Sequence, residues 1–250
     1  MLTTEDRASF ATDGVLIKRD LIACDRIESA RSLINDWLVT GMDLNHLAGY
    51  TQRTFAPELG SHPILLDLYY TREVAGAVRE LVGEPCPVKT AQIQIRLPQN
   101  QLHKPQPTKA MHVDGVACPH LDPNELRTFS LLVGVVLSDI GSPSGGALHY
   151  QPGGHLRMSE WFRDEWALGL THQTPPDVDS EKGIPFLGKP GDVLLMHHLV
   201  PHAVGANITS TPRTMVYFRV SHVDHQSRRL AALKDPWLDF PALVASRQGR

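Results

Sequence analysis

KPGDVLLMHHLVPHAVGAN, from Lys189 to Asn207, combines a turn, an apolar run and a group of histidines. Pro190–Asp192 has the composition of a turn. The apolar run Val193–Met196 that follows it has the length and residue types of a buried strand. Three histidines follow this apolar run, and each is a candidate metal ligand: His197, His198 and His202.

Short apolar runs bounded by Pro and Gly also occur on both sides of this stretch. Pro and Gly separate short β-branched runs, which predict strands at Val88–Leu97, Thr128–Leu137, Ala147–Gln151, Asp192–His197 and Thr214–Val220. Two longer connections, near 98–110 and 157–187, are polar and contain Pro, and connections of that length are usually functional or mobile. This series of strands predicts a β-sandwich or jelly roll.

The first third of the chain has a different pattern. Thr3 and Thr4 precede two acidic residues, which suits the start of a helix, and a short strand is expected at Gly14–Lys18. Residues 22–40 and 62–82 have apolar positions at helical spacing. We therefore expect a mainly β fold with flanking helices in a single domain over 1–250: a mainly helical flank at 1–85, a jelly-roll core at 86–225 and a C-terminal tail at 226–250.

Composition excludes several classes of protein. A net charge of −3 provides no global basic field, so we expect no nucleic-acid partner. No apolar run approaches the roughly 20 residues that span a bilayer, and the polar N-terminus is unlike a secretory signal. The 3 cysteines are widely spaced and form no CxxC pair, which argues against a thiolate zinc site and favours a reducing, cytoplasmic location.

A candidate metal site begins at His112 and Asp114. On an extended strand, residues two apart point to the same face, so one imidazole and one carboxylate project together. Gly115 allows the backbone to turn sharply beside them. A third ligand from elsewhere in the chain would complete a facial triad with open coordination positions. The His-x-Asp pair alone is a weak signal, so its value depends on that third ligand.

Arg213 is a candidate anion-binding residue. It stands eleven positions after His202, at the head of the apolar run Thr214–Val220. An arginine that enters a buried strand needs an anion, because burial of its unpaired charge is costly. A guanidinium can hold a carboxylate in bidentate fashion. Arg213 could therefore grip the distal carboxylate of a 2-oxoacid that chelates the metal.

Three motifs together resemble the phytanoyl-CoA dioxygenase family of iron(II)/2-oxoglutarate-dependent oxygenases. The first is the HxD pair at His112 and Asp114. The second, GGALHYQPGGH at Gly145–His155, is similar to the family's NG-x-L-x-x-x-PGSH segment, with Gly-Gly-His where Gly-Ser-His is usual. The third runs from Gly191-Asp192 through His202 to Arg213. The resemblance covers roughly residues 85–225.

The resemblance implies a ligand set and a reaction. His202 has the spacing of the family's distal ligand, so iron(II) would be held by His112, Asp114 and His202, while His197 and His198 would be structural. Arg213 would bind the cosubstrate 2-oxoglutarate. The enzyme would use O2 to hydroxylate a small-molecule substrate, and 2-oxoglutarate would be converted to succinate and carbon dioxide. Related halogenases have Gly or Ala in place of the carboxylate, so Asp114 favours hydroxylation, while desaturation or epoxidation stays open.

Three further residues are weaker candidates. Gln94 lies on the expected strand Val88–Leu97, where polar side chains of similar proteins approach 2-oxoglutarate or substrate, although a solvent-facing position is as well supported. Thr128 could reach the cosubstrate, or could make a simple buried hydrogen bond. Arg219 is on the same strand face as Arg213 and could meet an anionic substrate at the mouth of the barrel, with a surface salt bridge as the alternative.

Two other classes of function compete with a hydroxylase. A jelly roll with a degenerate site could bind 2-oxoglutarate or metal as a regulatory module without turnover, but the complete triad and Arg213 speak against it. A cupin-like enzyme that uses metal without a 2-oxoacid would leave Arg213 unexplained. Neither the substrate, which in similar proteins often belongs to bacterial secondary metabolism, nor the oligomeric state follows from the sequence.

Overall fold

The computed structural model describes residues 1–115, 126–164 and 183–243. Its helices are α1 (Thr4–Asp13), α2 (Cys24–Thr40), α3 (Leu47–Gln52), α4 (Pro63–Tyr69), α5 (Arg72–Val82), α6 (Gly154–Asp164) and α7 (His225–Lys234), with short 3-10 turns η1 (Leu44–His46), η2 (Pro57–Leu59) and η3 (Gln99–Gln101). Its strands are β1 (Val15–Lys18), β2 (Gln92–Arg96), β3 (Leu131–Val136), β4 (Leu148–Tyr150), β5 (Ile184–Pro185), β6 (Val193–His197), β7 (His202–Val204) and β8 (Arg213–Val220).

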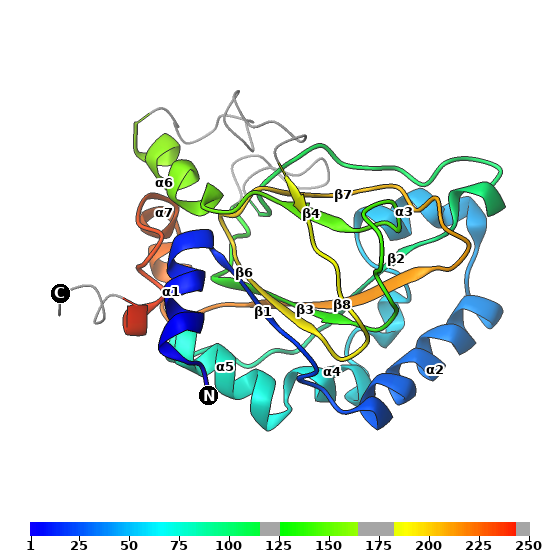
Figure 1. Ribbon diagram of the computed structural model, residues 1–250, viewed down its shortest axis with the longest axis horizontal. Coiled ribbons are helices and arrows are strands. Elements are labelled where there is room, and N and C mark those ends of the chain that lie inside the picture. Colours follow the sequence, from blue (N-terminus) through cyan, green and yellow to red (C-terminus); the bar gives the residue numbers. More distant parts are fainter. Residues whose placement is uncertain (116–125, 165–182, 244–250) are drawn as a thin grey trace.

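The strands form two antiparallel sheets that face each other (Figure 1). The larger has the order β1-β6-β3-β8-β2, and the smaller has the order β5-β4-β7. The expected jelly-roll core with flanking helices is confirmed. The division into segments of a single domain stays a prediction.

Alternation along the strands gives the larger sheet two apolar faces. Outward residues such as Val133, Val216 and Phe218 pack in one cluster with residues of the N-terminal helices. In Figure 1, α2, α4 and α5 lie along this side of the sheet. Inward residues such as Leu132 and Tyr217 pack against the smaller sheet. The helical flank therefore covers one face, and the other is free to line the space between the sheets.

Local signals account for most of the helix boundaries. Thr3 caps α1 through a capping box with Asp6, as the Thr-rich start predicted. The helix expected over 62–82 is instead two helices, because Thr71 acts as an N-cap and accepts a hydrogen bond from the backbone of Val74 at 3.2 Å. A Thr in this position begins a new helix even where the apolar spacing is continuous.

Several expected boundaries are wrong by a few residues. The strand expected at Thr128–Leu137 is shorter and spans Leu131–Val136. The connection near 157–187 begins within α6, and its residues 165–182 lie outside the described part.

The expected tail from 226 is largely structured within the described residues. It contains most of α7, which packs against α6. The side chains of Trp237, Asp239 and Phe240 are buried. Apolar burial therefore holds this segment against the body of the protein. In residues 1–115, 126–164 and 183–243, no helix combines the length and the apolar character needed to cross a membrane.

Candidate metal centre

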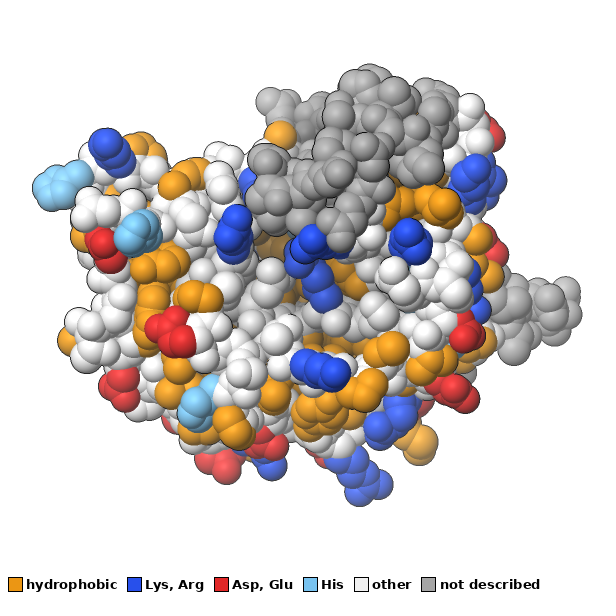
Figure 2. All heavy atoms as spheres, turned by 180° about the vertical axis from the view of Figure 1, so that it is seen from behind, with side chains coloured by type: hydrophobic (Ala, Val, Ile, Leu, Met, Phe, Trp, Pro, Cys, Tyr) orange, Lys and Arg blue, Asp and Glu red, His pale blue; other side chains and the backbone are white. Residues whose placement is uncertain are grey.

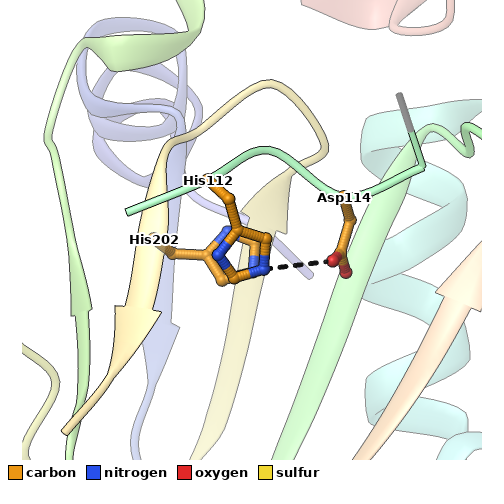
Figure 3. A group of neighbouring side chains, drawn as sticks. All are labelled: His112, Asp114 and His202. Carbon is orange, nitrogen blue, oxygen red and sulfur yellow. Dashed lines mark ion pairs between the residues drawn. The ribbon is translucent and has the colours of Figure 1, made fainter. Parts of the chain in front are cut away.

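His112, Asp114 and His202 converge on one point (Figure 3). One ligand atom from each residue lies within 4.8 Å of the others, and all three side chains are buried. The two histidines come from separate segments that a backbone bridge joins: His112 N–H donates to the His202 carbonyl at 3.0 Å, and His202 N–H donates to the His112 carbonyl at 2.9 Å. The backbone therefore sets the distance between the two imidazoles.

Backbone carbonyls fix the orientation of both rings. Nδ1 of His112 lies 2.9 Å from the carbonyl oxygen of Ala110, and Nδ1 of His202 lies 3.0 Å from that of Val200. A ring that donates its Nδ1 proton to a carbonyl keeps an unprotonated Nε2, which is the form that binds a metal. Nε2 of His112 lies 3.5 Å from Oδ1 of Asp114.

Gly115 is required by the turn after Asp114. Its φ is +78°, and a Cβ at this position would lie 2.3 Å from the carbonyl oxygen of Arg127. Arg127 N–H in turn donates to the Gly115 carbonyl at 2.8 Å. Only glycine combines this backbone conformation with so close an approach, so the sequence expectation of a sharp turn beside the metal motif is confirmed.

Electrostatics keep Asp114 and His202 in the charge states that a bound cation needs. Burial by itself raises the pKa of Asp114, but the charge of Arg219 holds that pKa well below its usual range. Burial and the neighbouring His112 lower the pKa of His202 to about 4. At neutral pH the carboxylate is therefore charged and His202 is neutral, as metal ligation requires.

Arg213 lies on the inner face of β8 with only 1% of its surface exposed. Its Nη2 donates to the hydroxyl of Tyr217 at 3.2 Å, whereas Nε and Nη1 have no hydrogen-bond partner among the described residues. Buried donors without a partner are costly. The guanidinium is therefore poised for an anionic group that enters the space between the sheets.

Arg96 adds a second buried guanidinium beside Arg213. The two residues are register partners on β2 and β8. Arg96 donates to the backbone carbonyls of Pro107 and Val204. Burial and the charge of Arg213 lower its pKa to about 10, so it stays charged at neutral pH. In the sequence, Arg96 was only a strand-end residue after two glutamines, and nothing in its local pattern shows that it faces Arg213.

The weaker candidates occupy three different surroundings. Gln94, also on the inner face of β2 opposite Met215, donates through its amide to the Arg53 carbonyl at 2.9 Å. Thr128 Oγ1 lies 2.9 Å from Nε2 of His225. Arg219 Nη2 lies 2.9 Å from Oδ2 of Asp114. Roles for Gln94 and Thr128 in cosubstrate binding, and for Arg219 in substrate binding, stay predictions.

His197 and His198 lie away from the triad in a buried aromatic cluster. Nε2 of His197 lies 2.7 Å from the Pro236 carbonyl, and its Nδ1 accepts a hydrogen bond from Leu199 N–H at 3.0 Å. The ring of His198 stacks on that of His197, with centroids 4.7 Å apart. Packing between β6 and the C-terminal segment explains both residues.

Positive side chains are also prominent on the outer surface of one face. Figure 2 shows several Lys and Arg side chains near the middle of the face seen from behind, while most acidic side chains lie nearer its rim. Such a distribution favours the approach of anionic small molecules.

A family model described as phytanoyl-CoA dioxygenase (PhyH) matches residues 10–215. No curated protein sequence matches this chain significantly. Solved structures do match in fold. HygX from Streptomyces hygroscopicus with nickel and 2-oxoglutarate bound is 18% identical with a TM-score of 0.60, and the match covers 89% of this chain and 88% of that one.

Two other solved structures are similarly related. The epimerase SnoN of nogalamycin biosynthesis, in complex with Fe3+, alpha ketoglutarate and nogalamycin RO, is 16% identical with a TM-score of 0.64 and coverage of 87% and 82%. EctD from S. alaskensis with 2-oxoglutarate and 5-hydroxyectoine is 18% identical with a TM-score of 0.63 and coverage of 89% and 77%. At these identities the likeness concerns the fold.

Proposed function

Because this chain belongs to the phytanoyl-CoA dioxygenase family, as its three motifs predicted, we propose that it is an iron(II)- and 2-oxoglutarate-dependent dioxygenase that hydroxylates a small molecule. The observation that carries the proposal is the buried convergence of His112, Asp114 and His202. Two imidazoles and one carboxylate that leave further positions open are the donor set of non-haem iron(II) oxygenases.

The donors fit iron(II) better than they fit a structural zinc, calcium or magnesium ion. A structural zinc site is closed by four ligands, usually with thiolates, whereas the described residues bring together three ligands without any cysteine. Calcium and magnesium prefer sets of oxygen ligands. His112 and His202 would bind through Nε2, since the carbonyls of Ala110 and Val200 occupy both Nδ1 atoms. Asp114 would supply the single negative charge.

Arg213 would hold the distal carboxylate of 2-oxoglutarate. Its Nε and Nη1 are buried and have no hydrogen-bond partner in the part of the chain that the structure describes, so a carboxylate that enters would relieve a desolvated charge and form charge-assisted hydrogen bonds. Arg96 would add positive potential to the same pocket, and Tyr217 would keep the guanidinium in place through its hydroxyl. These residues would orient the cosubstrate with its 2-oxo end toward the triad.

When bound, iron(II) and 2-oxoglutarate supply the oxidising chemistry that uses O2 and yields succinate and carbon dioxide. The protein's residues do the rest: they hold the cosubstrate, shield the site from bulk water and leave room for substrate beside the triad. Asp114 distinguishes the site from those of related halogenases, so we propose hydroxylation. The fold is shared with an epimerase and a carbocyclase, and the reaction class therefore depends on the substrate's position.

We propose a small organic molecule of secondary metabolism as the substrate and the cytoplasm as the place of action. The support for the substrate class is that HygX has been solved with hygromycin B bound and SnoN with nogalamycin RO bound.

Anaerobic titration of the metal-free protein with iron(II) and then 2-oxoglutarate tests this proposal. The complex should develop a weak visible charge-transfer band, and admission of O2 should release succinate even without substrate. Asp114→Ala should lose both signals, whereas Asp36→Ala, which changes an exposed carboxylate, should keep them. A band without succinate would indicate a binding module without turnover, and the absence of a band in folded wild-type protein would refute the metal assignment.

A further inference from the structure

Arg219 has a contact that the metal and cosubstrate sites do not by themselves require. We propose that Arg219 is a positioning residue that restricts Asp114 to one-oxygen coordination of the metal, so that three coordination positions stay open. This inference rests on the proposed function, because it concerns how the same site holds its metal.

The two carboxylate oxygens of Asp114 have separate neighbours. Oδ1 faces the histidines and lies 3.5 Å from Nε2 of His112. Oδ2 accepts a hydrogen bond from Nη2 of Arg219 at 2.9 Å. A guanidinium that holds one oxygen leaves the other to the cation. Rotation of the carboxylate to bring both oxygens to the metal would break this ion pair.

Arg219 is itself held in place. Its guanidinium carbon lies 5.3 Å from the centroid of the Phe129 ring, an arrangement typical of a cation–π contact. Phe129 is buried in the cluster between the sheets, whereas the side chain of Arg219 is 43% exposed. Among the described residues, Asp114 is the hydrogen-bond partner of this guanidinium. The contacts with the Phe129 ring and with the Asp114 carboxylate together hold the side chain of Arg219 in one position.

Arg213 and Arg219 lie on the same face of β8, since they are separated by an even number of positions. Arg213 lies at the buried end, where Nε and Nη1 have no partner among residues 1–115, 126–164 and 183–243, and Arg219 lies at the exposed end, where its Nη2 donates to Asp114. This division gives the two arginines different tasks. One is available to an incoming anion, and the other is committed to a ligand of the metal.

The number of open positions has a chemical consequence. An octahedral metal with three one-atom protein ligands has three positions left. A 2-oxoacid that chelates the metal would need two of them, and one would remain for O2. A carboxylate bound through both oxygens would occupy that last position. Arg219 would therefore preserve the site for O2 by its hold on Oδ2 of Asp114.

The test compares wild-type protein with Arg219→Gln, Arg219→Lys and the exposed control Arg72→Gln, each titrated with cobalt(II) alone and then with 2-oxoglutarate. Arg219→Gln should give a cobalt(II) complex whose visible spectrum indicates a higher coordination number, and this complex should bind 2-oxoglutarate about 10-fold more weakly. Arg219→Lys should recover part of the 2-oxoglutarate affinity and the wild-type spectrum, and Arg72→Gln should match wild type. Near-ultraviolet circular dichroism would show that the folds agree.

A second variant keeps the inference testable if Arg219→Gln is unstable. Phe129→Leu removes the ring that contacts the guanidinium and should produce a smaller change of the cobalt(II) spectrum and of the 2-oxoglutarate affinity in the same direction. An unchanged cobalt(II) spectrum and unchanged 2-oxoglutarate affinity in folded Arg219→Gln would overturn the positioning role, even if substrate binding were lost. Wild-type protein that binds neither cobalt(II) nor 2-oxoglutarate would instead overturn the proposed function, so the two failures are distinct.

Discussion

Lowering the pH from 7 to 5 should destabilise the metal-free protein through its buried histidines, and His198 offers the clearest test. Burial and the neighbouring His225 lower the pKa of His198 to about 3, and burial with the neighbouring His198 lowers that of His197 well below 6.5. Both imidazoles are neutral in the folded protein at pH 5. In the unfolded chain, where the ordinary pKa is 6.5, both are protonated.

The sign and size follow from proton linkage. Below pH 6.5 the unfolded chain binds a proton at each histidine and the folded protein does not. The free energy of unfolding is therefore highest above this pH and falls as the pH decreases. Between pH 7 and pH 5 each such histidine lowers the free energy of unfolding by about 2 kcal/mol. For His198 the loss continues toward its folded pKa of about 3. His202 contributes in the same way while the metal is absent.

Urea unfolding at pH 7, 6 and 5 in the presence of a chelator measures this loss. His198→Leu should reduce the loss of unfolding free energy between pH 7 and 5 by about 2 kcal/mol, because neither ring nitrogen of His198 has a partner among the described residues. His103→Leu is the matched control, since His103 is exposed and meets water in both states. Equal losses in wild type and His198→Leu would refute the reasoning.

Three further changes probe the site and its support. Gly115→Ala should cost about 1–3 kcal/mol in urea unfolding and weaken metal binding, because its Cβ would lie 2.3 Å from the Arg127 carbonyl oxygen; wild-type values for both would contradict this. Arg213→Gln should raise the KM for 2-oxoglutarate about 10- to 100-fold, the loss expected for a charge-assisted hydrogen bond, with cobalt(II) affinity retained; an unchanged KM would assign the cosubstrate to other residues. Asp239→Asn should lower the unfolding free energy by about 3 kcal/mol, since this buried carboxylate accepts hydrogen bonds from Ser130, His225 and Arg228; a loss under about 1 kcal/mol would contradict a structural role for the network.

Thr128 illustrates a contact that local sequence cannot predict. Its hydroxyl was expected to reach either the cosubstrate or a simple hydrogen-bond partner, and it lies against His225, which in turn contacts Asp239. These partners come from a segment that looked like a tail, because its polar residues have no strong periodicity. The network becomes visible only when α7 and the residues after it pack beside β3.

His112 and Asp114 are the opposite case. Their separation by one residue and the glycine that follows were enough to predict that both side chains point one way and that the chain then turns. Likewise, the alternation in β8 predicted that Arg213 and Arg219 share a face, and the apolar runs predicted the core strands and the helical flank. Each of these features depends on neighbours a few residues away, which the backbone geometry of a strand or helix determines directly.

The tertiary structure decided which of these pieces meet. The antiparallel bridge that joins His112 to His202 brings two distant segments together, and family resemblance rather than local pattern selected this histidine among three. The same packing set Arg219 against Asp114 and Arg96 beside Arg213. Contacts of this kind depend on how two sheets face each other and on where the chain reverses. That is a property of the whole core, whereas periodicity reports only which way each side chain points.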